Sequence, residues 1–189
     1  STDGADCLFI GHSFFVPVAA AFGQLAVANG FPAHSAQTVF GPGPAGSPAA
    51  LWDNPEQRAQ IEGILATGAI DIFGLATFSP QDSSFEDFAQ WIDLALAYNP
   101  QTTFFIGTPW VPGGPSLDTP TFDAAIEDQA FAYFEIVFAL REAYPDQRID
   151  FQCYGKTASV MKARFIASAT ASSVGQASSV SPSGRLMPA

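Results

Sequence analysis

The sequence predicts an α/β fold in three layers: a doubly wound, parallel, five-stranded sheet of the flavodoxin-like type, with strand order 2-1-3-4-5. Five short apolar runs occur along the chain, and continuous apolar runs are typical of strands that are buried on both faces. Segments with helical periodicity separate these runs. Strands that alternate with helices pair in parallel through right-handed crossovers, which predicts helices on both faces of the sheet.

The elements of the N-terminal half are bounded by glycine, proline and capping residues. In chain order they are strand 7–11, helix 16–29, strand 36–40, a Gly/Pro-rich loop 41–46, and a helical turn that Ser47 caps with Pro48 at its first position. Asn29 and Gly30 form a helix stop signal. Phe22, Leu25 and Ala26 share one face of the first helix, which predicts that this face is apolar.

The C-terminal half continues the alternation. Its predicted elements are helix 56–67, strand 70–77, helix 84–98, strand 102–107, loop 108–120, helix 121–144, strand 149–153 and helix 158–167. Apolar stripes on the first three of these helices are formed by Ile61, Ile64 and Leu65; by Phe85, Phe88, Ile92 and Ala95; and by Phe122, Ile126, Ala130, Phe134, Val137 and Leu140. These stripes predict the helix faces that pack on the sheet.

The chain divides into one domain at 1–167 and a tail at 168–189. The tail is rich in serine and holds no acidic and no aromatic residue, which predicts a flexible coil. A domain of this type is expected to continue with another ordered loop and helix. We therefore hypothesise a truncation or a reading-frame error near Ala167.

Charge and cysteine content exclude several classes of function. With 7 basic against 18 acidic residues, the net charge of -11 repels phosphate backbones, so nucleic acid is not an expected partner. No apolar run is long enough to span a bilayer. Cys7 and Cys153 are the two cysteines and lie in strands that are not neighbours in the predicted order. We expect buried free thiols and no thiolate metal site, while compartment and oligomeric state stay open.

Ligands of open parallel α/β sheets bind outside the carboxyl ends of the strands. The segments predicted at that edge are 11–13, 41–46, 77–84, 108–115 and 154–157. Ser13 follows a buried strand and precedes a helix, so its hydroxyl is expected at the positive end of the helix dipole. Such a position suits a nucleophile. It also suits a residue that only caps the helix.

The segment 7–15, CLFIGHSFF, resembles the first sequence block of the SGNH or GDSL serine hydrolases, an esterase family. In that family a strand ends in Gly-Asp-Ser or a variant, and the serine attacks the ester. Here His12 stands in place of the middle residue. The resemblance implies that Ser13 is the nucleophile and that its backbone N–H helps to form an oxyanion hole.

The resemblance also implies two further oxyanion donors. A glycine after the second strand matches Gly46 best, with Gly43 as the alternative. After the third strand the family carries Gly-x-Asn-Asp, whereas this chain has no asparagine between residues 77 and 83. Gln81 can supply a side-chain amide in its place, and Ser79 is a weaker candidate.

The family's general base is missing from its usual place. An Asp-x-x-His block is expected after the fifth strand, yet no histidine and no aspartate follow Cys153. His34 precedes the second strand and is predicted at the opposite edge of the sheet. His12 adjoins Ser13 and is the remaining catalytic candidate for a base. Neighbouring side chains near a strand end tend to point apart, however, so a hydrogen-bonded site residue is the favoured interpretation of His12.

The sequence therefore predicts a serine ester hydrolase, acting on carboxylic or acetyl esters through an acyl-serine intermediate, that is weak or inactive because its histidine is absent. No cofactor or metal is expected, and a small-molecule ester is the expected partner. The alternative is a non-catalytic domain that binds an ester or carbohydrate, with Trp110 and Trp52 as aromatic contacts.

A dinucleotide site is disfavoured. Residues 41–46 have the spacing Gly-x-Gly-x-x-Gly, but Pro42 and Pro44 have no N–H to offer a pyrophosphate. Asp71, the nearest suitable acid, begins a strand instead of ending one.

Overall fold

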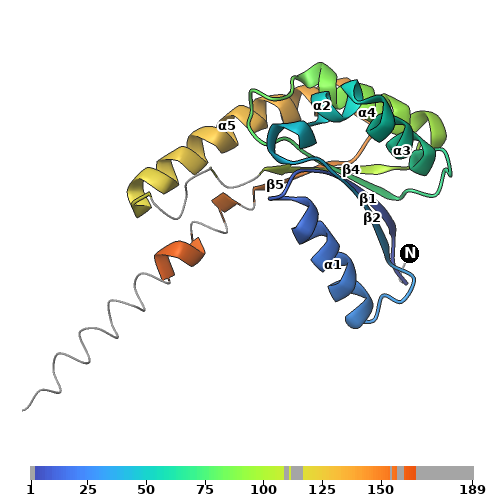
Figure 1. Cartoon of the computed structure of the whole chain (residues 1–189), viewed down its shortest axis with the longest axis horizontal. Helices are drawn as coiled ribbons and strands as arrows, with labels where there is room; N and C mark the ends of the chain where they lie inside the picture. Colours follow the sequence, from blue (N-terminus) through green and yellow to red (C-terminus); the bar gives the residue numbers. More distant parts are fainter. Residues whose placement is uncertain (1–2, 109–110, 112–116, 154, 157–159, 165–189) are drawn as a thin grey trace, which may run out of the picture.

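A parallel sheet of five strands forms the centre of the computed structural model (Figure 1), which describes residues 3–108, 111, 117–153, 155–156 and 160–164. Its strands are β1 (Asp6–Gly11), β2 (Ser35–Phe40), β3 (Ile72–Ala76), β4 (Thr103–Thr108) and β5 (Ile149–Cys153). They lie in the order β2-β1-β3-β4-β5, and every pair is parallel. The predicted fold class and strand order are confirmed.

The register places equivalent apolar residues side by side across the sheet. Ile10 of β1 pairs with Val39 of β2 and Leu75 of β3, and Leu75 pairs in turn with Ile106 of β4. Because all strands run the same way, the loops that follow them leave the sheet at one edge. The same register puts His34, which precedes Ser35 of β2, at the other edge, as predicted.

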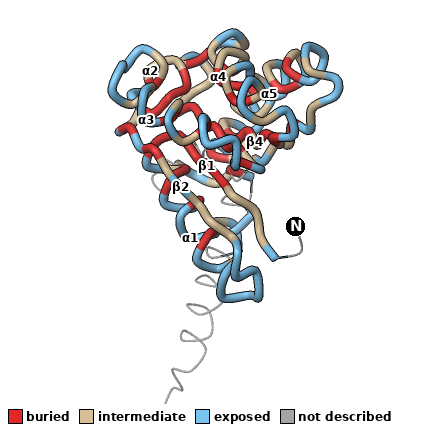
Figure 2. Tube along the Cα trace, turned by 90° about the vertical axis from the view of Figure 1, so that its right-hand side faces the viewer, coloured by how far each residue is buried: buried red, intermediate tan, exposed pale blue. Residues whose placement is uncertain are grey.

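Four α-helices cover one face of the sheet (Figure 1): α2 (Pro48–Asp53), α3 (Pro55–Leu65), α4 (Phe85–Tyr98) and α5 (Thr119–Ala143). Their N-termini are capped by Ser47, Asn54, Ser84 and Asp118, each of which accepts a backbone N–H. Trp91 of α4 is fully buried in this layer, and its indole N–H donates to the carbonyl of Pro48 at 2.9 Å. Figure 2 shows the buried residues concentrated between these helices and the strands.

Helix α1 (Val16–Ala28) lies on the other face of the sheet (Figure 1). Its buried residues are Val16, Ala19 and Gly23, whereas Phe22 is 58% and Leu25 is 61% exposed. A Cβ atom on Gly23 would lie 2.8 Å from the Cβ of Ala36 in β2, so the helix approaches the sheet through its small residues. The predicted apolar face exists, but its two large residues face solvent.

The long helix α5 differs from the prediction in its start and in one stripe position. It begins at Thr119 and not at residue 121, because the Asp118 carboxylate caps it by accepting the Thr121 N–H at 2.8 Å. The predicted stripe includes Phe134, but Phe134 is 41% exposed, and its neighbour Tyr133 is buried instead. Phe134 packs instead against Phe151, with ring centroids 4.5 Å apart.

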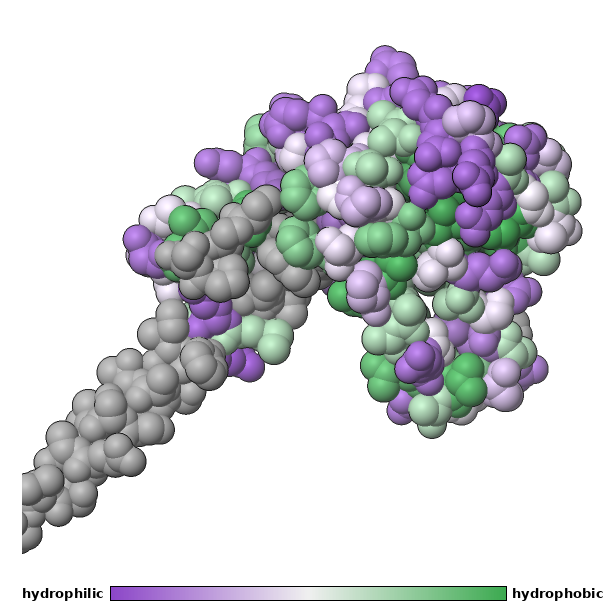
Figure 3. All heavy atoms as spheres, in the orientation of Figure 1, coloured by the Kyte–Doolittle hydropathy of each residue, from purple (hydrophilic) through white to green (hydrophobic). Residues whose placement is uncertain are grey.

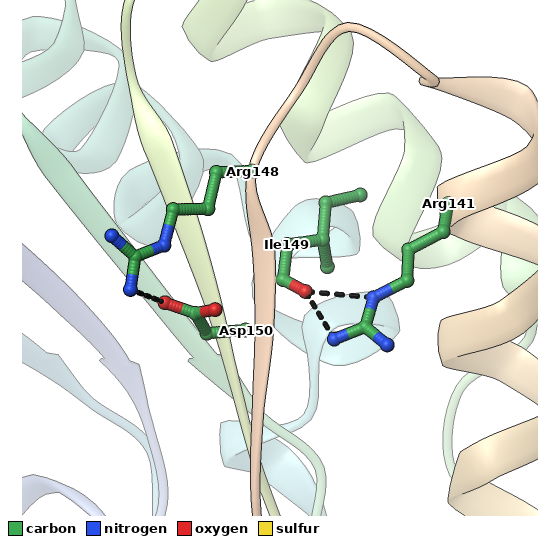
Figure 4. Close-up of polar contacts among 4 residues, drawn as sticks. All are labelled: Arg141, Arg148, Ile149 and Asp150. Carbon is green, nitrogen blue, oxygen red and sulfur yellow. Dashed lines mark hydrogen bonds and ion pairs between the residues drawn. The ribbon is translucent and has the colours of Figure 1, made fainter.

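The C-terminal end of α5 is tied to β5 (Figure 4). The Arg141 guanidinium donates two hydrogen bonds to the carbonyl oxygen of Ile149, at 2.9 and 2.6 Å. Arg148 and Asp150 form an ion pair at 2.7 Å, which is exposed and therefore contributes little to stability. The Arg141 contacts fix the helix over the edge strand of the sheet.

The two cysteines are free thiols, as predicted. Cys7 is buried on β1, but Cys153 on β5 is only half-buried, so the prediction of two buried thiols is wrong for Cys153. Two strands separate them.

Several predicted features lie outside the described residues. These are Trp110, the tail 168–189, and both ends of the predicted helix 158–167, of which residues 160–164 are described and are helical. In the described part of the chain, no helix is both long and apolar enough to cross a membrane.

Candidate functional site

Three of the predicted segments meet at the carboxyl edge of the sheet. The N–H of Gly41 donates to the carbonyl of Gly11 at 3.0 Å, which joins the loop after β2 to the end of β1. The imidazole Nε2–H of His12 donates to the carbonyl of Thr77 at 3.0 Å, which joins β1 to the loop after β3. The segments after β4 and β5 are described only at residues 108, 111, 155 and 156. The site is therefore built from the first three loops.

Ser13 lies in the turn between β1 and α1, and its side chain is exposed. The His12 carbonyl closes this turn by accepting the N–H groups of Phe15 and Val16, both at 3.0 Å. Phe15 is the N-cap residue of α1, and no side-chain hydrogen bond caps this terminus. The interpretation of Ser13 as a helix cap is therefore wrong, and its hydroxyl stands at the mouth of the sheet without that structural role.

Gly46 packs directly against the end of β1. It belongs to the short 3-10 helix η1 (Gly43–Gly46), and a Cβ atom on it would lie 2.6 Å from the carbonyl oxygen of Gly11 and 2.5 Å from that of Gly41. Only a glycine fits this close approach of two backbones. The structure thus brings Gly46 beside the segment that carries Ser13.

Gly43, the alternative glycine, has a different role. Its φ of +53° is a backbone conformation that favours glycine, and no atom lies within 4 Å of the place of its missing Cβ. It forms the turn into η1 but does not approach β1. Of the two predicted glycines, Gly46 is therefore the better candidate for an oxyanion donor.

His12 is fully buried, and both of its ring nitrogens are hydrogen-bonded. A carbonyl oxygen can only accept, so the nitrogen that faces Thr77, Nε2, carries the proton. Nδ1 accepts the Phe14 N–H at 3.3 Å. Burial lowers the pKa of His12, despite its hydrogen bond to Thr77 and the nearby Asp82 carboxylate, so the neutral ring is favoured.

These contacts argue against a base role for His12. To take a proton from Ser13, Nδ1 would have to release the Phe14 N–H, and the ring would become a buried cation. The geometry favours the other interpretation of His12, a hydrogen-bonded residue that connects the ends of β1 and β3.

Aromatic side chains surround this connection. Phe14 and Phe78 stack with centroids 5.8 Å apart, and the His12 ring stands edge-on to both, at 5.7 and 5.4 Å. Phe14 and Phe78 are half-buried, so they form an apolar wall beside Ser13. Sequence reasoning missed this wall. The available signal was that the two phenylalanines follow strand ends, Phe14 three residues after β1 and Phe78 two residues after β3.

The loop after β3 is held in place by its own polar groups. Asp82 accepts the Ser79 N–H at 2.9 Å and donates its own N–H to the Ser79 carbonyl at 3.1 Å. Because this turn uses the Ser79 backbone, Ser79 is tied into the loop structure. Gln81 lies in the same turn and is exposed, so its side-chain amide is accessible to solvent. Of the two predicted donors, Gln81 is the better placed.

Two residues of this region were missed by the sequence analysis, Asp82 and Tyr133. The hydroxyl of Tyr133 on α5 donates to the same Thr77 carbonyl that binds His12, at 3.2 Å. Burial raises the pKa of Tyr133, which keeps its hydroxyl protonated, and the charge of Asp82 acts in the same direction. Asp82 was visible as an acid after the third strand, whereas nothing in the sequence links Tyr133 to that loop.

Trp52 does not lie free to hold a ligand. It packs edge-on against Trp91 at 4.7 Å, and the Arg58 guanidinium covers its ring at 3.8 Å. The Trp52 ring therefore packs against the core, and this packing argues against its predicted role as an aromatic contact for a ligand. Within the described ranges, no group of three or more His, Cys, Asp or Glu side chains is arranged to hold a metal ion.

Comparison with models of known protein families finds no match to this chain, and comparison with curated protein sequences finds none either. The class that the described fold defines is a flavodoxin-like α/β domain with an exposed serine, Ser13, at the carboxyl edge of its sheet. Folds of this class host many different chemistries, so the function depends on the residues at that edge.

Proposed function

We propose that this chain is an SGNH-like serine hydrolase domain that binds small carboxylic or acetyl esters at Ser13 and turns them over weakly. The observation that carries the proposal is the exposed Ser13 at the carboxyl edge of a parallel sheet, two residues after Gly11, against which Gly46 packs. A nucleophile and close backbone amides are what acyl transfer requires.

Each group at the edge has a role in this proposal. Ser13 Oγ attacks the ester carbonyl carbon, while the N–H groups of Ser13 and Gly46 stabilise the negative charge that develops on the carbonyl oxygen. The side-chain amide of Gln81 is the third donor. Phe14 and Phe78 provide an apolar contact for the acyl or alcohol group.

The proposed reaction has two steps. The Ser13 hydroxyl passes its proton to solvent as its oxygen bonds to the carbonyl carbon, and the ester C–O bond breaks so that the alcohol leaves with a proton from water. Water then cleaves the acyl-serine bond. Because His12 is held in two hydrogen bonds, it does not serve as the base in either step, and a base contributes about 100- to 10,000-fold to rate.

A p-nitrophenyl acetate assay with the full chain and with Ser13→Ala tests the proposal. We expect a slow release of p-nitrophenol that depends on Ser13. Labelling with a fluorophosphonate, followed by peptide mapping, is expected to mark Ser13 in the folded protein and to fail after heat denaturation. Equal ester hydrolysis by both proteins, together with no label on Ser13, would rule out a nucleophilic serine.

The second candidate is a non-catalytic domain that binds esters or carbohydrates at the same edge. The engagement of both His12 nitrogens favours it, because His12 is then not available to activate the serine. The expected result is saturable binding of a non-hydrolysable ester analogue, measured by calorimetry, with no acyl-serine formed. Loss of that binding in Gly46→Val would locate it at this edge.

A further inference from the structure

The long helix α5 carries a row of exposed phenylalanines, here called the phenylalanine row, that does not face the core. Phe131 is 68% exposed, Phe138 is 57% exposed and Phe134 is 41% exposed. They follow one another at spacings of three and four residues, so they lie on one face of the helix. Buried residues of α5 such as Tyr133 and Val137 lie on a different face. Helix α5 is therefore apolar both toward the core and toward solvent.

Ring contacts hold the phenylalanine row in place. Phe134 and Phe138 stack with ring centroids 6.1 Å apart, and Phe134 also packs against Phe151 of β5, with ring centroids 4.5 Å apart. A side chain that is already held in one position loses less freedom on binding. Apolar residues gathered into one surface are typical of an interaction site, whereas apolar residues exposed singly are ordinary.

An acidic row runs beside the phenylalanine row. Asp128, Glu135 and Glu142 are all exposed and lie seven residues apart, which places them nearly in line along the helix. Glu135 comes four residues after Phe131, and Glu142 comes four residues after Phe138, so the two rows are neighbours. Figure 3 shows hydrophobic and hydrophilic side chains next to one another over the part of the molecule that α5 occupies in Figure 1.

The acidic row is not neutralised by the described part of the chain. Neither of the ion pairs found among the described residues involves its three carboxylates. Arg141 precedes Glu142 in the chain, but its guanidinium donates to the Ile149 carbonyl. Because charges of one sign in a row repel one another and attract the opposite sign, the row is complementary to a basic surface.

Two other occupants fit this face of α5 less well. If a second copy packed antiparallel against it, the two-fold axis would bring the acidic rows of both copies to the same side, where they repel. An anionic lipid surface would be repelled by the same carboxylates. A separate polypeptide with positive charge meets neither objection.

We propose that the outer face of α5 binds a basic amphipathic helix of another protein. The apolar side of that helix packs on the phenylalanine row, and lysine or arginine side chains spaced seven residues apart lie over the acidic row. An apolar seam flanked by opposite charges is the arrangement by which helices pair in coiled coils. The net charge of -11 on the chain attracts such a partner before contact.

The test is a fluorescence anisotropy titration of the full chain against a fluorescein-labelled peptide of three heptads, with leucines on one face and lysines beside them. We expect saturable binding with one peptide per chain. A matched peptide with glutamate in place of each lysine is expected to bind at least about tenfold more weakly. Raising the NaCl concentration from about 50 to about 500 mM is expected to weaken binding of the lysine peptide several-fold.

The first variant tests the phenylalanine row. Phe138→Gln is expected to weaken binding of the lysine peptide about tenfold. Its matched control is Phe22→Gln, which alters a phenylalanine on α1 that is 58% exposed and is expected to leave binding unchanged. Both side chains are more than half exposed, so both variants are expected to fold, which circular dichroism can verify.

The second variant neutralises the acidic row, and its control neutralises three acidic residues of α2 and α3. The substitutions are Asp128→Asn, Glu135→Gln and Glu142→Gln for the row, and Asp53→Asn, Glu56→Gln and Glu62→Gln for the control. Both sets change the net charge equally. We expect the row variant to bind the lysine peptide about tenfold more weakly and with little dependence on salt, and the control to bind nearly as the wild type does.

Four results would overturn the proposal: no saturable binding of the lysine peptide, equal binding of the glutamate peptide, equal weakening by Phe138→Gln and Phe22→Gln, or equal weakening by the row variant and its control. A fifth is a concentration-dependent dimer in sedimentation that Phe138→Gln dissociates, because a second copy would then cover the phenylalanine row. None of these outcomes depends on ester hydrolysis at Ser13.

Discussion

The two faces of the sheet are covered in different ways. On one face, α2 to α5 enclose a cluster that contains Leu8, Phe73, Trp91 and Phe104, all fully buried. On the other face α1 packs against a smaller cluster around Phe9 and Phe15, and its own large apolar residues remain exposed. The difference teaches that buried apolar surface is concentrated on the four-helix face, while α1 buries mainly small residues against the sheet.

The largest expected effect separates the two faces directly. Trp91→Ala on the four-helix face removes a fully buried ring and the partner of the Pro48 carbonyl, so we expect a loss of about 3–5 kcal/mol of unfolding free energy. Phe22→Ala on the α1 face is expected to change it by less than about 0.5 kcal/mol. Urea denaturation of the two variants measures both. Similar losses would show that the faces contribute equally.

A medium effect is expected where the carboxyl edge is packed most tightly. Gly46→Ala forces a methyl group against the carbonyls of Gly11 and Gly41, so backbone must shift, at a cost of about 1–3 kcal/mol. Gly43→Ala meets no atom but is strained by its φ of +53°, which costs about 1–2 kcal/mol. We expect only Gly46→Ala to abolish labelling of Ser13. Loss of Ser13 labelling in both variants would contradict the conclusion that Gly46, and not Gly43, is the glycine that matters for the site at Ser13.

The smallest effect is a pH dependence from His12. Burial lowers its pKa in the folded state below that in the unfolded chain, which is about 6.5. Below that pH the unfolded state binds more protons, so the contribution of His12 to stability is present at neutral pH and is lost as the pH falls through its folded pKa. Comparison of urea midpoints at pH 7.5 and 5.5 is expected to show a smaller difference in His12→Asn than in the wild type. If the urea midpoint changes between pH 7.5 and 5.5 by the same amount in both proteins, His12 does not contribute to the pH dependence of stability.

Helix α1 shows why a sequence pattern predicts a face but not its direction. Val16, Ala19 and Gly23 form one apolar face, and Val18, Phe22 and Leu25 form another, so both were available for burial. The small residues were buried because the helix lies close to β2, where a side chain on Gly23 would meet Ala36. Such close packing depends on the distance between the helix and the sheet, which the hydrophobic periodicity of the sequence does not specify.

The candidate site divides in a similar way. Ser13, Gly46 and Gln81 could be placed at the carboxyl edge from strand order alone, because parallel strands end together. The contacts of Thr77 with both His12 and Tyr133 could not be predicted, since they join residues 65 and 56 positions apart. Their formation depends on how the loop after β3 folds back on α5.

By itself, the sequence determined the parallel sheet, its strand order and the edge at which Ser13 stands, because buried strands and crossover helices admit few arrangements. Only the tertiary structure decided that His12 is occupied by two hydrogen bonds and that Phe22 and Leu25 are exposed to solvent. Those outcomes depend on side-chain geometry between segments distant in the chain, which local patterns of hydrophobicity and capping do not specify.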